Sequence, residues 1–80
     1  MNPRVIAVEA LPNYHLKLTF ANRERKVFDA SPYLQIGIFT ELVDQNLFFQ
    51  VKAFNGSVVW PNDLDFDPDT LYLDSQPIDS

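Results

Sequence analysis

The dipeptide Asn55-Gly56 is the local signal that most restricts the fold of this 80-residue chain. A type I′ turn needs a positive φ angle at both of its central residues, and Asn followed by Gly meets that need best. The dipeptide therefore predicts a tight hairpin between strands at 50–54 and 57–60. Across a two-residue loop, one face of this hairpin carries Val51, Ala53, Val58 and Trp60, and the other carries Lys52, Phe54, Ser57 and Val59.

Three further strands are predicted upstream of this hairpin. Residues 4–11 are apolar on both faces and are closed by a Pro-Asn turn, which favours a central or covered strand. Residues 15–20 alternate apolar and polar side chains, which predicts a strand with one buried and one solvent-exposed face. Residues 24–29 return as its partner after a turn in which Asn22 tolerates positive φ.

The register of that second hairpin stays open. A two-residue loop places Val27 opposite Leu18, and a three-residue loop places Phe28 there. Both candidates are apolar, so the hydrophobic pattern does not choose between them.

The segment between 31 and 49 predicts short helical pieces. Ser31-Pro32 marks a start, because Ser can cap free amide donors and Pro fits the first helical position. Gly37 then interrupts the apolar pattern, so we expect a turn at 32–35, a helix near 38–43 and a further turn at 45–49. This excursion is the only element expected to cover the sheet.

The C-terminal part is expected to be irregular. Pro61 ends the last hairpin strand because it lacks an amide donor. A turn centred on Pro68 precedes a short extended segment at 70–73, and residues 76–80 are expected to fray. Together the elements predict one α+β domain over residues 1–75. Its small, curved, mostly antiparallel sheet has about five short strands, with the helical excursion between the third and fourth.

The negative charge of the chain is concentrated at its C-terminal end. Six of the eleven acidic residues and none of the six basic ones follow Pro61, so residues 1–60 sum to +1 and residues 61–80 to -6. The net charge of -5 opposes sequence-independent binding to nucleic acid or to anionic membranes. With no Cys, and no apolar run near the roughly 20 residues that span a bilayer, a cytoplasmic location is expected.

No constellation of residues predicts catalysis or a cofactor. A catalytic site of this kind needs a nucleophile, a base and a group that orients the base. His15 is the single histidine and lies on the polar face of its predicted strand, and no nucleophile motif accompanies it. We therefore expect no enzyme and no cofactor.

Asp63, Asp65 and Asp67 resemble a calcium loop in their spacing, with Asp74 at the twelfth position of the run. The pattern departs from such a loop because Pro68 stands where Gly is required and Asp74 replaces the longer Glu. The two-residue period has a simpler explanation, in which Leu64 and Phe66 point inward and the Asp side chains outward. No metal site is therefore expected.

A basic cluster is predicted at the tip of the second hairpin, from Arg23, Arg25 and Lys26. Acidic residues interleave with these bases and no basic recognition helix follows, so direct binding to nucleic acid is not expected. The tip can instead pair with the acidic end of a second copy of the chain. A structural homo-oligomer, in which copies join through the unpaired edge strands of the sheet, is a separate alternative function.

Six motifs carry a resemblance to a known family: P-R-V at 3–5, L-T-F-A-N at 18–22, F-D-A-S-P-Y-L at 28–34, G-I-F at 37–39, V-V-W-P-N-D-L-D at 58–65 and P-D-T-L-Y at 68–72. On these motifs the chain resembles the bacterial domain of unknown function numbered 2442. Relatives commonly carry Gly where this chain has Arg23 and Asp63. The resemblance implies a compact α+β domain and supplies no catalytic residues. Stand-alone relatives look like gene neighbours of another small protein, as in a toxin and antitoxin pair.

The absence of chemistry and the local acidity favour a noncatalytic protein-binding module, an antitoxin-like or regulatory partner of a basic protein. The residues expected to contact that partner are Trp60, Asn62, Asp63, Asp65, Asp67 and Asp69. A second alternative is an enzyme or metal site in a pocket lined by Trp60, Asn62, Asp63 and Asp65. A structural role is also open, in which Trp60 closes the core and Asn62 bonds the backbone in an Asx turn.

Overall fold

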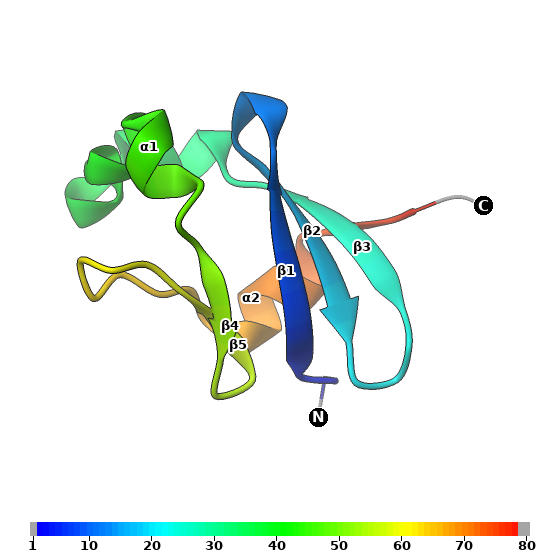
Figure 1. Cartoon of the computed structure of the whole chain (residues 1–80). Coiled ribbons are helices and arrows are strands. Elements are labelled where there is room, and N and C mark those ends of the chain that lie inside the picture. The colour runs from blue at the N-terminus through cyan, green and yellow to red at the C-terminus, as the bar shows by residue number, and fades with distance from the viewer. Residues whose placement is uncertain (1, 79–80) are drawn as a thin grey trace.

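The computed structural model describes residues 2–78 and shows an α+β fold (Figure 1). Four antiparallel strands form a sheet in the order β1-β2-β3-β6, and β4 and β5 form a separate hairpin. The strands are β1 Val5–Leu11, β2 His15–Phe20, β3 Arg25–Asp29, β4 Lys52–Phe54, β5 Ser57–Val59 and β6 Gln76–Pro77. The predicted fold class is confirmed, although the strands divide between two units instead of forming one five-stranded sheet.

Strand β1 was predicted to be central or covered, and the central position is wrong because β1 lies at the edge of its sheet. Val5 is buried, but the next side chain, Ile6, is exposed. The outer side of β1 borders the β4–β5 hairpin, where the Val5 amide donates to the Gly56 carbonyl at 3.0 Å. The Arg4 guanidinium (Nη1) donates to the Asn55 carbonyl at 3.3 Å. The hairpin thus adjoins β1 without extending its ladder (Figure 1).

The β2–β3 hairpin confirms the predicted alternation and corrects its register. Every second side chain of β2, from Leu16 to Phe20, is fully buried. Leu18 pairs with Lys26, so neither of the two predicted partners lies opposite it. The Asn22 side chain accepts a hydrogen bond from the Glu24 amide at 3.0 Å. This Asx-type bond shapes the turn, and Arg23, instead of Asn22, has the positive φ of 74°.

The segment after β3 forms three short helices, as predicted. Two 3-10 helices, Ser31–Gln35 and Gly37–Val43, precede the α-helix α1, Gln45–Phe48. Gly37 separates the first two with a φ of 49°, a left-handed conformation that Gly adopts without steric cost. The predicted Ser31 cap is wrong, because the Asp29 carboxylate accepts hydrogen bonds from the Ser31 amide at 2.9 Å and hydroxyl at 2.7 Å.

The C-terminal part is more regular than predicted. Residues 68–73 form the helix α2, Pro68–Leu73, in place of a turn and an extended segment. Asp67 caps this helix by accepting from the Thr70 amide at 3.3 Å, and Pro68 takes the first helical position. Strand β6 pairs with β3, so 76–77 are not frayed; residues 79–80 lie outside the described part.

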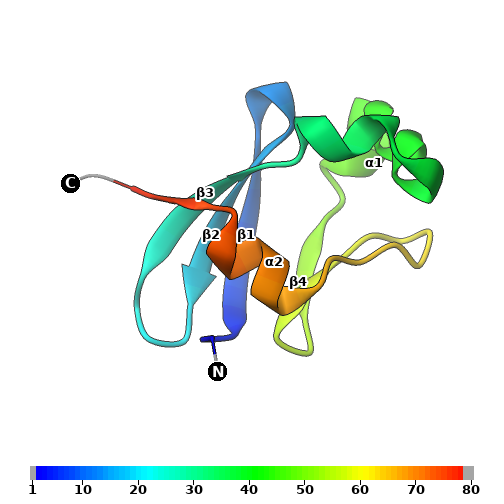
Figure 2. The same cartoon turned by 180° about the vertical axis from the view of Figure 1, so that it is seen from behind.

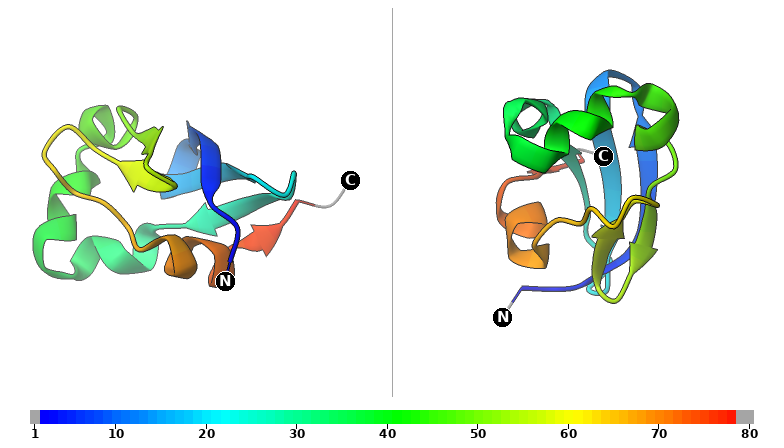
Figure 3. Two further views of the ribbon diagram at one scale, coloured as in Figure 1. Left: turned by 90° about the horizontal axis from the view of Figure 1, so that it is seen from below. Right: turned by 90° about the vertical axis from the view of Figure 1, so that its left-hand side faces the viewer.

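The core lies between the sheet, the hairpin and the helices. Helix α2 lies across one face of the sheet, so the 31–49 segment is not the only cover (Figures 2 and 3). Phe66 is central to this core, because its ring contacts four other aromatic rings. The fully or nearly fully buried apolar side chains are Val5, Leu16, Leu18, Phe20, Phe28, Ala30, Leu34, Leu42, Phe48, Val58, Trp60, Leu64, Phe66 and Leu71.

Candidate partner-binding groove

The segment 63–67 runs beside β5 and is held there by backbone contacts. The Trp60 amide donates to the Leu64 carbonyl at 2.9 Å, and the Asp63 amide donates to the Trp60 carbonyl at 3.1 Å. Val59 and Asp65 then form an isolated antiparallel bridge. The chain reverses tightly between them, with Asp63 at a φ of 68°. The hairpin therefore gains a short third segment along its β5 edge.

Side chains of the 63–67 segment alternate between the core and the surface. Leu64 and Phe66 are buried, whereas Asp63, Asp65 and Asp67 are exposed. This alternation confirms the period-two explanation of the Asp spacing. The Ser57 hydroxyl also donates to the Phe66 carbonyl, which joins the segment to β5 a second time.

Pairing fixes which side chains share the outer face of this layer. Directly opposed residues in a ladder project to the same side. Lys52 pairs with Val59, and Val59 pairs in turn with Asp65, so these three form one row. Phe54 pairs with Ser57 in the adjacent row.

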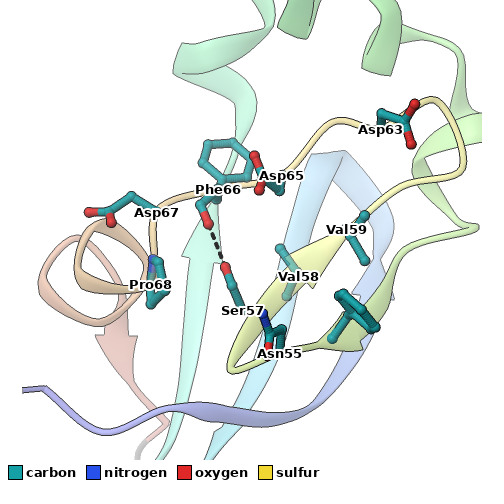
Figure 4. A pocket seen from close by; sticks show the side chains of 10 residues that line it. Asn55, Ser57, Val58, Val59, Asp63, Asp65, Phe66, Asp67 and Pro68 are labelled. Atoms are coloured by element: carbon teal, nitrogen blue, oxygen red, sulfur yellow. Dashed lines mark hydrogen bonds between the residues drawn. The ribbon is translucent and has the colours of Figure 1, made fainter.

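A groove of about 560 Å³ lies between the hairpin and the 63–67 segment (Figure 4). Its apolar floor includes Phe54, Val59 and Pro68, and Phe54 is 64% exposed. Asp63, Asp65 and Asp67 line it along the 63–67 segment, with Asp63 in the loop and the Asp67 carboxylate turned toward α2, which it caps (Figure 4). We name this feature the acidic groove. It combines apolar surface with carboxylates within one hollow.

The carboxylates of the acidic groove have no cationic partner among residues 2–78. The ion pairs in that range join His15 to Asp29 at 3.9 Å and Lys17 to Glu9 at 3.5 Å. Asp67 uses one oxygen, Oδ2, to cap α2. The carboxylates of the groove therefore form no ion pair within residues 2–78, although Arg4 lines a neighbouring hollow with Asp67, and Lys52 lies in the same row as Asp65.

Three of the six predicted partner-binding residues meet at the acidic groove, and three do not. Trp60 is 1% exposed and its indole N–H donates to the Phe48 carbonyl at 2.9 Å, so burial excludes it from any surface contact. Asn62 accepts from the Leu64 amide at 3.4 Å, the predicted Asx turn, and donates to Glu41 at 2.9 Å. Asp69 lies on α2, where it accepts from Asn2 at 3.1 Å.

Only two of the three basic residues predicted at the tip of the second hairpin lie at the surface. Lys26 is only 9% exposed, and its ammonium donates to the Tyr72 carbonyl at 2.8 Å while lying 3.7 Å from the centroid of the Tyr72 ring. Arg23 and Arg25 remain exposed. The surface cluster is thus smaller than the sequence indicated.

Glu24 is tied into the same internal contact. The Tyr72 hydroxyl donates to Glu24 at 2.6 Å, and Asn22 also donates to that carboxylate. The Tyr72 hydrogen bond, with help from Asn22 and the Lys26 charge, lowers the Glu24 pKa from its usual value. The same bond raises the Tyr72 pKa. The charges at this hairpin therefore serve to attach α2 to the sheet.

Other chemistry has little geometric support in the described chain. Residues 2–78 contain no group of three or more His, Asp or Glu side chains that could hold a metal ion. Asp74, the twelfth position of the calcium-like run, accepts instead from the Tyr33 hydroxyl at 3.0 Å. The pocket postulated for an enzyme or metal site was expected to have Trp60 in its lining. Trp60 is instead buried in the core.

The sequence interpretation missed the apolar floor of the groove. The hairpin pattern places Phe54 and Val59 on the same face as Lys52 and Ser57, but nothing in the sequence links that face to the acidic residues. The link is the bridge from Val59 to Asp65, a contact that the sequence pattern does not specify.

The fold and the groove together describe a small α+β domain with one acidic, partly apolar hollow. A family model described as "Protein of unknown function (DUF2442)" matches residues 5–77. The chain belongs to that family, as its motifs indicated. Comparison with curated proteins and with solved structures finds no match. None of the helices in residues 2–78 has the length and apolar character needed to cross a membrane.

Proposed function

We propose that the protein is a noncatalytic binding module that docks a basic protein through its acidic groove, as an antitoxin-like or regulatory partner of a neighbouring small protein. One observation carries the proposal. Asp63, Asp65 and Asp67 line an open hollow without a cationic partner in residues 2–78. Complementary charge accelerates association and disfavours partners of the wrong sign. A basic surface is therefore the partner that this groove favours.

Capture from the native host tests the proposal directly. The tagged protein is expected to retain a stoichiometric basic partner, and the variant with Asp63→Asn, Asp65→Asn and Asp67→Asn is expected to lose it. The amides preserve the fold, because Asn tolerates positive φ and retains an oxygen that can cap α2. The single variant Glu9→Gln changes an exposed acid on β1 and serves as the control. Equal capture by the wild-type and triple-variant proteins would refute the proposal.

A structural homo-oligomer is the second candidate. Its support is that Arg23 and Arg25 are exposed on the same molecule as the acidic groove, so two copies carry complementary surfaces. Light scattering at low and high salt measures it. An assembly that dissociates with salt supports this function, and a monomer mass at every salt concentration excludes it.

A further inference from the structure

We propose that Asn55 is a site of spontaneous deamidation, and that the isoaspartate formed there loosens the β4–β5 hairpin from β1. The modification goes beyond the proposed function, because it concerns the covalent stability of one turn and needs no partner. It depends on the free side chain of Asn55, the free amide nitrogen of Gly56 and the contacts that join this turn to β1.

The two reactive groups are adjacent and unengaged. Asn55 is exposed, and within residues 2–78 its hydrogen bond from Arg4 goes to the main-chain carbonyl and leaves the side chain free. The Gly56 amide donates no hydrogen bond in the same range. Since Gly carries no Cβ, no side chain shields that nitrogen.

The reaction needs water as its sole co-reactant. The Gly56 nitrogen attacks Cγ of Asn55, the bond from Cγ to Nδ2 breaks, and Nδ2 leaves as ammonia with the amide proton. Water then opens the resulting cyclic imide. Opening at Cγ gives aspartate on the original backbone, whereas opening at the main-chain carbonyl gives isoaspartate, whose backbone is longer by a methylene. No electrons are gained or lost overall.

Ring closure requires the turn to open briefly. Asn55 and Gly56 have φ angles of 55° and 86°, as a type I′ turn requires, and the cyclic imide needs other angles. Strands β4 and β5 have three residues each, and so short a hairpin opens locally at a small cost in free energy.

The other asparagines in residues 2–78 lack this combination. Asn22 and Asn62 each use their side chains in two hydrogen bonds. Asn13 and Asn46 precede larger residues, whose side chains hinder attack by the following nitrogen. Asn2 precedes Pro, which has no amide proton to lose. We therefore expect Asn55 to react first.

The backbone around Asn55 has little room for an added methylene. The Val5 amide donates to the Gly56 carbonyl at 3.0 Å, and Arg4 donates to the Asn55 carbonyl at 3.3 Å. Arg4 also packs closely over the turn, since a Cβ added to Gly56 would lie 2.6 Å from its Nη1. Isoaspartate therefore displaces these contacts, whereas aspartate keeps them because Asp-Gly suits the same turn.

Incubation of the folded protein in water labelled with heavy oxygen, at mildly alkaline pH, tests the reaction. After proteolysis in ordinary water, mass spectrometry is expected to show heavy oxygen at position 55 several-fold sooner than at Asn22 or Asn62. Asn55→Gly keeps the turn, since Gly-Gly also forms it, and should abolish uptake at that position. Arg23→Gly is the matched control. Its Asn22 also precedes Gly but keeps its bonds to Glu24, so it should react more slowly than Asn55.

Hydrogen exchange at the Val5 amide tests the loosening. The isoaspartyl protein, separated by chromatography, is expected to exchange that proton faster than the wild type, and Asn55→Asp is expected to match the wild type. Equal exchange in the isoaspartyl and wild-type proteins would overturn the loosening. Absence of heavy oxygen at position 55, uptake no faster than at the other asparagines, or equal rates at Asn22 and Asn55 in Arg23→Gly would overturn the assignment of the site.

Discussion

The two hairpins of this protein use their charged residues in opposite ways. At the β2–β3 hairpin, Glu24 and Lys26 contact Tyr72 of α2, so their polar groups are satisfied within the chain. At the β4–β5 hairpin, the adjoining Asp63 and Asp65 have no ion-pair partner among the described residues. The difference teaches that net charge alone does not locate a binding surface. What matters is which charges the fold has already paired.

Within the β4–β5 hairpin, the largest contrast lies between its two faces. Trp60→Ala is expected to destabilise the protein by about 3–5 kcal/mol, because it removes a large buried side chain. Phe54→Ala is expected to change stability by less than about 0.5 kcal/mol, since that ring is exposed. Urea unfolding monitored by far-UV circular dichroism measures both. Similar losses for the two variants would contradict the assignment of the faces.

Lys26 provides the corresponding test of the β2–β3 hairpin. Lys26→Met keeps most of the apolar stem but removes the hydrogen bond to the Tyr72 carbonyl, so a loss of about 1–3 kcal/mol is expected. The control is Arg25→Met, at an exposed neighbouring position. Equal midpoints of unfolding for these two variants would show that Lys26 does not anchor α2.

Replacing residues of positive φ by Gly in two tight turns is expected to raise the stability of the protein. Arg23 and Asp63 both have positive φ, at 74° and 68°. Arg23→Gly is expected to stabilise by up to about 1 kcal/mol, through relief of left-handed strain. Asp63→Gly should gain less, because Asp tolerates this conformation better than Arg. Asn22→Gly is the control and should destabilise, since it removes the bond to the Glu24 amide. A lower midpoint of thermal unfolding for Arg23→Gly than for the wild type would contradict backbone strain at Arg23.

The Glu24–Tyr72 contact should make stability depend on pH. The folded-state pKa of Glu24 is lowered, so its contribution is present above the ordinary value of about 4.3 and is lost as pH falls through the folded-state value. Tyr72→Phe removes the hydroxyl whose hydrogen bond is the largest single cause of the lowered pKa. The stability difference between wild type and Tyr72→Phe should therefore shrink below about pH 4. A constant difference from pH 7 to pH 3 would contradict this origin.

The smallest expected effect comes from the acidic groove itself. Asp65→Asn removes one of three neighbouring like charges and should raise stability by a few tenths of a kcal/mol at low salt. The gain should vanish at high salt, where exposed charges are screened. Differential scanning calorimetry at two salt concentrations measures it. A loss of stability would mean that Asp65 makes a structural contact.

Local signals predicted the elements that short-range contacts form. Asn55-Gly56 predicted the β4–β5 hairpin and its register, and Gly37 predicted the break between helical pieces. The 63–67 alternation was also predicted, including its buried partners. In each case the relevant residues lie within a few positions of one another, so their pattern is visible in the sequence.

The errors concern contacts between distant parts of the chain. Lys26 was predicted to lie in a surface cluster. Its burial depends on a contact with Tyr72, 46 positions away, which the local sequence pattern does not reveal. Helix α2 was missed because Asp67-Pro68 is both a turn signal and a helix start, and packing against the sheet decides between the two. The groove was only half predicted for the same reason. Its acids were identified, but its floor depends on how the 63–67 segment pairs with β5.

The central place of Phe66 in the core also bears on how the protein folds as it is synthesised. The rings of Phe28 and Tyr33 both pack on Phe66, which lies more than thirty positions later in the chain. Strands β1 to β3 therefore leave the ribosome without their main core partner and expose apolar surface until the last quarter of the chain emerges. A partner that binds the 63–67 segment during translation would therefore bind while Phe66 is closing the core.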